Sequence, residues 1–365
     1  MNIIFDNIVF NLQRSGGISV VWYELLKRIE KEPIGNVVQY VDNYAEDNYY
    51  RHLLDINKEL IIATDRYPSI SRYLSVSLDS QQPLVFHSSY YRYCNNPNAR
   101  NVTTVHDFTY EYYRTGFAKS LHCWQKYRAI RHSDIVVCIS ENTKKDLLRF
   151  VPDIKEDKVR VIYNGISEEY CVLDSADGYI LPFEKETYVV FVGNRKDNYK
   201  NFDLLKRCIS STPYSLVIVG SGLTDEEDKD LRKYVPDGRY KCMGFLPNEE
   251  LNIIYNNAAA LVYPSEYEGF GIPVIEAQRA GCPVIAYNSS SIPEIIGKTP
   301  LLMDEISEKE LIGKMSMLSD KPLMCSVIFE GLANSKRFSW DKMCRQYVDL
   351  YKELLNDNHH NNSHV

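Results

Sequence analysis

Short apolar runs alternate with segments of helical periodicity along most of the chain. In the first half, such runs fall at residues 2–5, 37–41, 84–86, 101–105, 135–139 and 159–163. In the second half, they fall at residues 187–192, 216–219, 261–263 and 282–286. Runs this short and this apolar are typical of strands that are buried on both faces of a sheet. Their alternation with helices predicts an α/β fold with parallel sheets and right-handed crossovers.

The irregular segment 167–186 interrupts this alternation and indicates a linker. It separates an N-terminal domain at residues 1–166 from a C-terminal domain at residues 187–337. A last helix is expected at residues 338–355, and the polar tail at residues 356–365 is expected to be disordered. Residues 42–80 are polar and tyrosine-rich, and their pattern does not define elements.

The composition is that of an ordinary globular protein and narrows the functional classes. The formal net charge of −7 argues against bulk nucleic-acid binding. The nine cysteines include no C-x-x-C pair, which disfavours a zinc site and fits free thiols in a reducing compartment. No apolar run approaches the roughly 20 residues of a membrane span, and the first residues lack a signal-peptide pattern. We therefore expect a cytoplasmic protein.

The stretch at residues 263–286, YPSEYEGFGIPVIEAQRAGCPVIA, carries the strongest chemical signal. A strand ends at Tyr263, a glycine-containing loop follows, and Ile272 and Pro273 open a helix, because proline suits a first helical turn. Gly281 is expected to end that helix in the left-handed conformation. The free N–H groups and the dipole at the start of such a helix form an anion site.

Two glutamates flank this anion site. Glu268 lies on the loop, and Glu276 is expected in the first turn of the helix. Carboxylates accept hydrogen bonds in pairs and therefore suit sugar hydroxyls. Glu276 alone could equally be a surface residue that complements the helix dipole.

The letters E-G-F-G-I-P-V-I-E-A, followed by G-C-P-V-I-A and S-S-I-P-E-I-I-G, resemble the glutamate-x7-glutamate signature of the family 4 retaining glycosyltransferases. The resemblance implies a GT-B fold, with two Rossmann-like domains that each contain a parallel sheet and an interdomain cleft for a nucleotide sugar. It implies that Glu268 holds the sugar hydroxyls and Glu276 the ribose. It also implies that backbone amides hold the donor diphosphate, namely those of Phe270, Gly271 and Ile272. F-S-W at residues 338–340 resembles the family's final segment, whose helix returns to the N-terminal domain.

The N-terminal half contains two further candidates. Gly16 and Gly17 lie between a strand and a helical pattern, which is typical of a phosphate loop but equally of a plain turn. The resemblance places this glycine pair opposite the donor phosphates. T-V-H-D-F-T also resembles the family, and this implies that His106 contacts the donor sugar and aids the departing phosphate. His87, at another strand end, is expected to be structural.

Two cations follow the first strand of the C-terminal half. Arg195 lies in a G-N-R turn and Lys200 opens the next helix, a spacing that resembles the family's phosphate clamp. Fixed cations stabilise a departing diphosphate most in the transition state, when its charge rises. Lys196 competes with Arg195 for this role. Because cations and helix amides can neutralise the diphosphate and no D-x-D motif is suitably placed, we expect no metal or other cofactor.

The pattern at residues 114–132 predicts a helix rich in basic residues, with an apolar stripe of Phe117, Leu121 and Trp124. We expect a packed surface helix whose basic face is solvated. The alternative is contact with an anionic membrane at the inner face of the cell membrane, where a lipid-linked acceptor would reside.

The letters Y-K-N and E-G-F-G-I-P-V-I-E-A resemble bacterial mannosyltransferase-like members of this family. The resemblance implies a retaining hexosyltransferase that acts in bacterial surface polysaccharide biosynthesis, such as that of lipopolysaccharide. The first choice of donor is GDP-mannose, followed by a UDP-hexose, and the acceptor is a glycan or a lipid-linked oligosaccharide. A non-catalytic GT-B scaffold in a glycan assembly complex is one alternative. A nicotinamide-dependent oxidoreductase is another, although no G-x-G-x-x-G follows Phe5.

Overall fold

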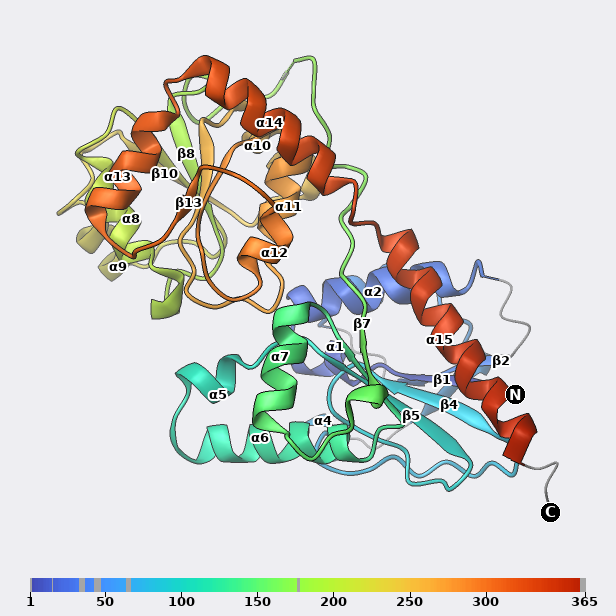
Figure 1. Cartoon of the computed structure of the whole chain (residues 1–365). Helices are drawn as coiled ribbons and strands as arrows, with labels where there is room; N and C mark the ends of the chain where they lie inside the picture. Colours follow the sequence, from blue (N-terminus) through green and yellow to red (C-terminus); the bar gives the residue numbers. More distant parts are fainter. Residues whose placement is uncertain are drawn as a thin grey trace. The chain divides into compact units, whose positions relative to one another are not determined.

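The computed structural model describes residues 2–14, 16–32, 37–42, 47–63, 67–175 and 178–361. The chain forms two compact units. Unit 1 comprises Met1–Gly165 and Trp340–Val365, and unit 2 comprises Ile166–Ser339. Each unit contains a parallel sheet with helices packed against it, as the alternating pattern predicts (Figure 1).

The described part of unit 1 contains a seven-stranded parallel sheet in the order β3-β2-β1-β4-β5-β6-β7. Its strands are β1 Asn2–Asp6, β2 Val37–Asp42, β3 Ile61–Ala63, β4 Leu84–Ser88, β5 Ala99–Val105, β6 Ile135–Cys138 and β7 Val159–Val161. Strand β4 is buried along its whole length, which explains its unbroken apolar run. The predicted strands are confirmed, and β3 lies in the polar stretch whose pattern defines no element. The strand order reverses between β1 and β4, and ligands bind at the carboxyl ends of strands around such a point.

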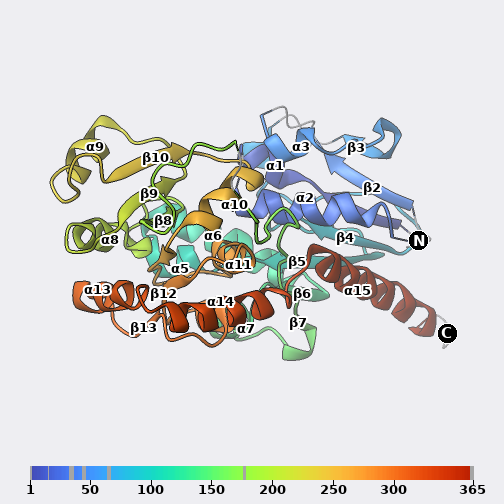
Figure 2. The same cartoon turned by 90° about the horizontal axis from the view of Figure 1, so that it is seen from above.

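The helices of unit 1 cover both faces of this sheet. They are α1 Ile8–Leu12, α2 Gly17–Ile29, α3 Tyr49–His52, α4 Pro68–Ser71, α5 Thr109–Tyr113, α6 Gly116–Arg131, α7 Glu141–Phe150 and α15 Trp340–Asn361. Helix α15 packs against α2 and β4 (Figures 1 and 2). It continues to Asn361, beyond the end expected at residue 355. Residues 362–365 lie outside the described residues.

A buried histidine fastens α15 to the sheet. His87 on β4 bonds the Tyr351 hydroxyl through Nδ1 at 2.7 Å and the Thr104 hydroxyl through Nε2 at 2.9 Å. The ring of Tyr347 stacks on the imidazole at 5.3 Å between centroids. Burial lowers the pKa of His87 to about 3, so the ring is neutral. The structural role predicted for His87 is confirmed, because both of its ring nitrogens bond within the core.

The described part of unit 2 contains a six-stranded parallel sheet in the order β10-β9-β8-β11-β12-β13. Its strands are β8 Tyr188–Val192, β9 Ser215–Val219, β10 Tyr240–Gly244, β11 Ala260–Tyr263, β12 Val284–Tyr287 and β13 Leu302–Met303. Its helices are α8 Phe202–Ile209, α9 Asp225–Leu231, α10 Asn248–Asn257, α11 Ile272–Arg279, α12 Ile292–Ile296, α13 Glu308–Met317 and α14 Lys321–Ser335. Strand order reverses between β8 and β11, which pair directly. The loops that follow these two strands are therefore the natural walls of a ligand site in unit 2.

Helix α6 presents only part of the solvated basic face that its sequence predicts, because Arg131 is half exposed whereas its other cations turn toward the protein. Lys126 is fully buried, and Lys119 donates to the carbonyl of Glu111. Arg128 donates to the carbonyl of Tyr73, and Arg131 forms an ion pair with Asp153. Long basic side chains reach partners on neighbouring segments that sequence periodicity does not reveal.

The apolar stripe expected on α6 is also partly wrong. Phe117 is 81% exposed and Trp124 is 50% exposed, so neither ring is packed into unit 1. Lys126 of this helix therefore points into the protein, whereas the rings of Phe117 and Trp124 are exposed to solvent.

We predict that Tyr351→Phe destabilises unit 1 by about 1–3 kcal/mol, because it leaves a buried ring nitrogen of His87 without its partner. Equilibrium urea unfolding followed by tryptophan fluorescence measures this, since all three tryptophans, Trp22, Trp124 and Trp340, lie in unit 1. Tyr49→Phe is the matched control, because that side chain is 62% exposed. Equal stability of the two variants would contradict the role of the His87 bond.

Candidate active site

The loop between β11 and α11 is built around a glycine. Gly271 precedes α11 with a φ of +94°, and a Cβ atom there would lie 2.8 Å from Cδ1 of Ile292. No side chain caps the helix. Because Pro273 has no N–H and Val274 donates to the carbonyl of Gly271 at 3.0 Å, the N–H of Ile272 is the one that the start of the helix leaves for the loop. The predicted helix start at Ile272 and Pro273 is confirmed, as is the left-handed conformation of Gly281 with a φ of +74°.

Three consecutive serine hydroxyls hold the backbone of this loop. Ser289 donates to the carbonyl of Glu266 at 2.7 Å, and Ser290 accepts from the N–H of Glu268 at 2.9 Å. Ser291 donates to the carbonyls of Glu268 at 2.8 Å and Phe270 at 3.0 Å. The sequence motif contains these serines but does not indicate that they hold the loop. A run of small hydroxyl residues directly after a strand is the signal that could have indicated it.

An ion pair joins the loops that follow β8 and β11. Nζ of Lys200 lies 2.8 Å from Oε1 of Glu268, with 13% and 16% of the two side chains exposed. Asn201, in the left-handed conformation with a φ of +51°, donates to the carbonyl of Pro264 and to the carboxylate of Glu266. These contacts fix the segment that carries Lys200 against the glycine loop. The structure thus brings together two predicted site residues at the reversal point of the sheet.

Tyr263 completes the surroundings of this ion pair. Its ring lies under the Lys200 ammonium, with 5.6 Å between Nζ and the ring centroid. Burial raises the pKa of Tyr263 well above its usual value, and the neighbouring Glu268 carboxylate raises it further. The phenol therefore stays protonated and faces Glu268 as a hydrogen-bond donor.

The guanidinium of Arg195 is engaged elsewhere in unit 2. It donates to the carbonyls of Ser221 at 2.8 Å and Gly222 at 3.0 Å, and it lies 3.4 Å from the carboxylate of Glu227. Arg195 therefore ties the loop after β8 to the loop after β9. Lys196, the alternative clamp residue, is exposed.

Glu276 lies one turn further along α11 than expected. Because the helix begins at Ile272, the first turn contains no acidic residue, and the expected first-turn position is wrong. Burial raises the pKa of Glu276 to about 7, while a hydrogen bond from the Tyr170 hydroxyl opposes the shift. This carboxyl group is therefore partly protonated near neutral pH and can donate as well as accept.

The unit 1 candidates lie at the amino-terminal end of α2 and after β5. Gly17 is the first residue of α2, and a Cβ atom built on it meets nothing within 4 Å. A Cβ atom on Gly16 would lie 2.2 Å from Oε1 of Gln13. His106 directly follows β5 and is 8% exposed. Burial lowers the pKa of His106 to about 4, against the attraction of Asp107, so its imidazole is neutral at physiological pH.

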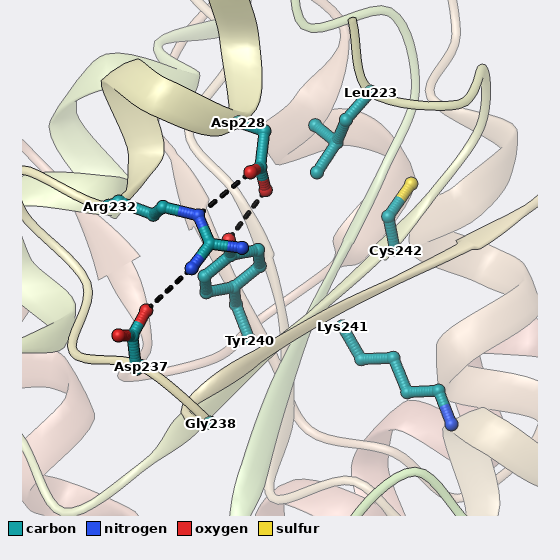
Figure 3. A pocket seen from close by; sticks show the side chains of 8 residues that line it. All are labelled: Leu223, Asp228, Arg232, Asp237, Gly238, Tyr240, Lys241 and Cys242. Atoms are coloured by element: carbon teal, nitrogen blue, oxygen red, sulfur yellow. Dashed lines mark hydrogen bonds and ion pairs between the residues drawn. The ribbon is translucent and has the colours of Figure 1, made fainter. Parts of the chain in front are cut away.

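A pocket of about 420 Å³ lies between α9 and β10 in unit 2 (Figure 3). Its charged groups bind one another: Arg232 donates to Asp228 and to Asp237 at 2.8 Å each, and Tyr240 donates to Asp228 at 2.6 Å. No predicted site residue lines the pocket. Arg232, Asp228, Asp237 and Tyr240 are thus paired with one another and do not by themselves indicate a ligand.

The described residues contain neither a cluster of metal ligands nor a membrane-spanning helix. No three His, Cys, Asp or Glu side chains there lie close enough to hold a metal ion. No helix among the described residues is long and apolar enough to cross a membrane.

Two family models match the chain in succession. The model described as Glycosyltransferase Family 4 matches residues 15–170, and the model described as Glycosyl transferases group 1 matches residues 179–327.

Several curated relatives carry mannosyltransferase names. O-antigen chain mannosyltransferase B of Escherichia coli is 27% identical over 280 residues, which are 70% of this chain and 71% of that protein. O-antigen chain mannosyltransferase RfbU of Salmonella typhimurium is 31% identical over 220 residues, or 58% of this chain and 59% of that protein. Serotype-specific mannosyltransferase WbdA of E. coli is 26% identical over 63% of this chain, but the match covers only 30% of that longer protein.

Solved structures share the fold across nearly the whole chain. Sucrose-phosphate synthase of Thermosynechococcus elongatus has a TM-score of 0.71 at 17% identity, covering 98% of this chain and 100% of that chain. HepE of Anabaena, solved with UDP and glucose, has a TM-score of 0.67 at 16% identity, covering 96% and 99%. The predicted GT-B fold is confirmed, and the oxidoreductase alternative is wrong because both family models describe glycosyltransferases. The chain therefore belongs to the group 1 and family 4 glycosyltransferases and is a glycosyltransferase of the GT-B fold.

Proposed function

We propose that the protein transfers a hexosyl group, mannosyl as the first choice, from a nucleotide-diphosphate sugar to a glycan or lipid-linked acceptor during surface polysaccharide synthesis. The observation that carries this proposal is the Lys200–Glu268 pair beside the uncapped start of α11. It offers a cation and helix amides for a diphosphate and a carboxylate for sugar hydroxyls. The O-antigen mannosyltransferase names of the relatives support GDP-mannose, and the UDP bound to HepE keeps a UDP-hexose as the second choice.

The ion pair suggests how donor binding prepares this site. The diphosphate competes with Glu268 for the Lys200 ammonium and, once bound, leaves the carboxylate able to accept hydrogen bonds from the sugar. Lys200 and the first amides of α11 then stabilise the negative charge that grows on the departing diphosphate. No metal is needed in this scheme.

We assign the remaining roles from the same chemistry. Glu276 holds the ribose hydroxyls, and Gly16 and Gly17 let the phosphates approach the start of α2. Neutral His106 hydrogen-bonds the transferred sugar. In a retaining transfer, the bond from the anomeric carbon to the diphosphate oxygen breaks, the acceptor oxygen bonds to the same face of that carbon, and the acceptor proton passes to the diphosphate.

Exposed apolar side chains, rather than basic ones, are the features of unit 1 that suit contact with a membrane. Exposed apolar side chains of α6 and of the segment around α4 are Tyr67, Ile70, Leu74, Phe117 and Trp124. Gln125 of α6 donates to the carbonyl of Arg72 at 2.7 Å, so these segments are neighbours. Residues 67–78 contain no Asp or Glu, and neither do residues 112–133. We propose that aromatic and aliphatic side chains, rather than a solvated basic face, bring the protein to the surface that holds a lipid-linked acceptor.

Our first prediction for this function concerns Glu268→Ala. Transfer should fall at least about 100-fold, because a group that binds the sugar in the transition state is lost. The melting temperature should change little, since a partly exposed ion pair contributes at most about 1 kcal/mol. Release of nucleoside diphosphate from GDP-mannose and UDP-hexoses measures transfer, and Glu330→Ala on the exposed face of α14 is the control. Undiminished turnover would defeat the assignment, and donor binding without turnover in the wild type would favour the scaffold alternative.

A second prediction concerns the pH dependence of stability. The Glu276 carboxyl in the folded protein keeps its proton up to about pH 7, whereas in the unfolded chain it ionises near 4.5. The folded state binds more protons in this window, so its stability falls as pH rises from about 4.5 to 7. Glu276→Gln should remove a decrease on the order of 2 kcal/mol. Urea unfolding followed by circular dichroism at pH 5 and pH 8 tests this, with Glu330→Gln as control. Equal pH slopes for wild type and Glu276→Gln would contradict it.

A third prediction concerns the exposed aromatics. Phe117→Ser combined with Trp124→Ser should lower vesicle binding at least about tenfold, because burying each ring contributes about 1.5–3 kcal/mol. Wild-type binding should persist in about 0.5 M salt, where exposed charges are screened. Co-sedimentation with phosphatidylglycerol and phosphatidylcholine vesicles measures both effects. Phe329→Ser is the matched control, since Phe329 is 70% exposed but lies on α14 of unit 2. Salt-sensitive binding confined to the anionic vesicles would restore the electrostatic alternative.

A further inference from the structure

A fully buried ion pair lies beneath the loop that carries His106. The side chain of Lys126 on α6 is 0% exposed, and that of Glu111 on α5 is 2% exposed. Nζ of Lys126 lies 2.9 Å from Oε2 of Glu111 and donates to the backbone carbonyl of Asp107 at 2.9 Å. The ammonium also lies over the ring of Phe108, 4.4 Å from its centroid. One side chain thus contacts residues 107, 108 and 111, which directly follow His106.

Burying this ion pair contributes little net free energy to folding. Removing two charges from water costs more than their attraction commonly returns, and an apolar pair of the same volume is often at least as stable. General stability is therefore a weak explanation for the Lys126–Glu111 pair.

The Lys126–Glu111 pair does restrain one segment, the turn that follows β5. The carbonyl of Asp107 is held by Lys126, while Oδ1 of Asp107 accepts from the N–H of Thr109 at 2.9 Å. Phe108 is fully buried and stacks on Phe150 of α7 at 5.3 Å between centroids. The turn after β5 is therefore fixed on its carboxyl side by an ammonium, an N–H group and a ring. Since β5 fixes its amino side, the backbone of His106 has little freedom.

We propose that Lys126 and Glu111 are a positioning pair that sets the orientation of the His106 ring for the transfer reaction. The inference rests on the role proposed above for His106. Neither residue touches the donor: Lys126 acts through the backbone of Asp107, and Glu111 holds the ammonium in place. The ion pair also lets the chain bury a cation beside a neutral histidine, because the carboxylate balances its charge.

The test is the double variant Lys126→Met with Glu111→Leu, which removes both charges and leaves no buried charge alone. Its melting temperature should stay near that of the wild type. Its kcat with GDP-mannose should fall about tenfold to a hundredfold at unchanged donor KM, since a small misplacement of a reacting group has effects of that size. The control is Lys206→Met with Asp230→Leu, which removes a Lys–Asp pair in unit 2 and should leave kcat unchanged. Wild-type kcat in the Lys126 and Glu111 double variant would overturn the proposal.

A second readout separates this proposal from the proposed function. Nitrogen-15 histidine NMR, with the His106 signals assigned by His106→Gln, reports the ring's tautomer and order without any substrate. In the double variant these signals should shift or broaden, while those of His87 should remain in place. Unchanged His106 signals would overturn the positioning role. If the wild type is inert with every nucleotide sugar, the proposed function fails, and the NMR result still decides whether the pair orders His106.

Discussion

The Lys200–Glu268 ion pair is the interaction on which the chemistry of unit 2 depends. It joins two loops at the point where the strand order reverses, which is where parallel sheets place their ligands. A cation and a carboxylate that neutralise each other are stable without a donor. In the function proposed above, a donor diphosphate offers the ammonium a partner of higher charge and thereby releases Glu268 to bind a sugar.

Rigidity around this pair comes almost entirely from contacts to backbone atoms. Ser289, Ser290 and Ser291 bond carbonyl and N–H groups of the glycine loop, and Asn201 bonds the carbonyl of Pro264. These contacts hold the backbone of the loop, while its Glu268 side chain pairs with Lys200 and its Glu266 side chain accepts from Asn201. A loop held in this way can keep its amides in place while Lys200 and Glu268 exchange partners, which is what preorganised electrostatic stabilisation requires.

Much of the fold and part of the site could be predicted from the sequence, because they depend on local pattern. Apolar runs located the strands, and Pro273 and Gly281 located the ends of α11. The direction of long side chains could not be predicted in this way. Arg195 follows a strand as a phosphate clamp would, yet its guanidinium bonds the carbonyls of Ser221 and Gly222. The start of α11 at Ile272 was predicted, yet Glu276 is the fifth residue of the helix and lies in its second turn rather than in the expected first turn.

The side of helix α6 that faces solvent could not be predicted from its composition. Basic residues are usually solvated and aromatic residues buried, so the sequence favours a basic outer face. The cations of α6 bind groups of neighbouring segments instead: Lys126 binds the buried carboxylate of Glu111 on α5, and Arg128 donates to the carbonyl of Tyr73. The aromatic rings of Phe117 and Trp124 then occupy the outer positions. The inner side of this helix thus holds the turn that follows β5 through Lys126, and its outer side carries exposed aromatic rings, which is the surface proposed above for membrane contact.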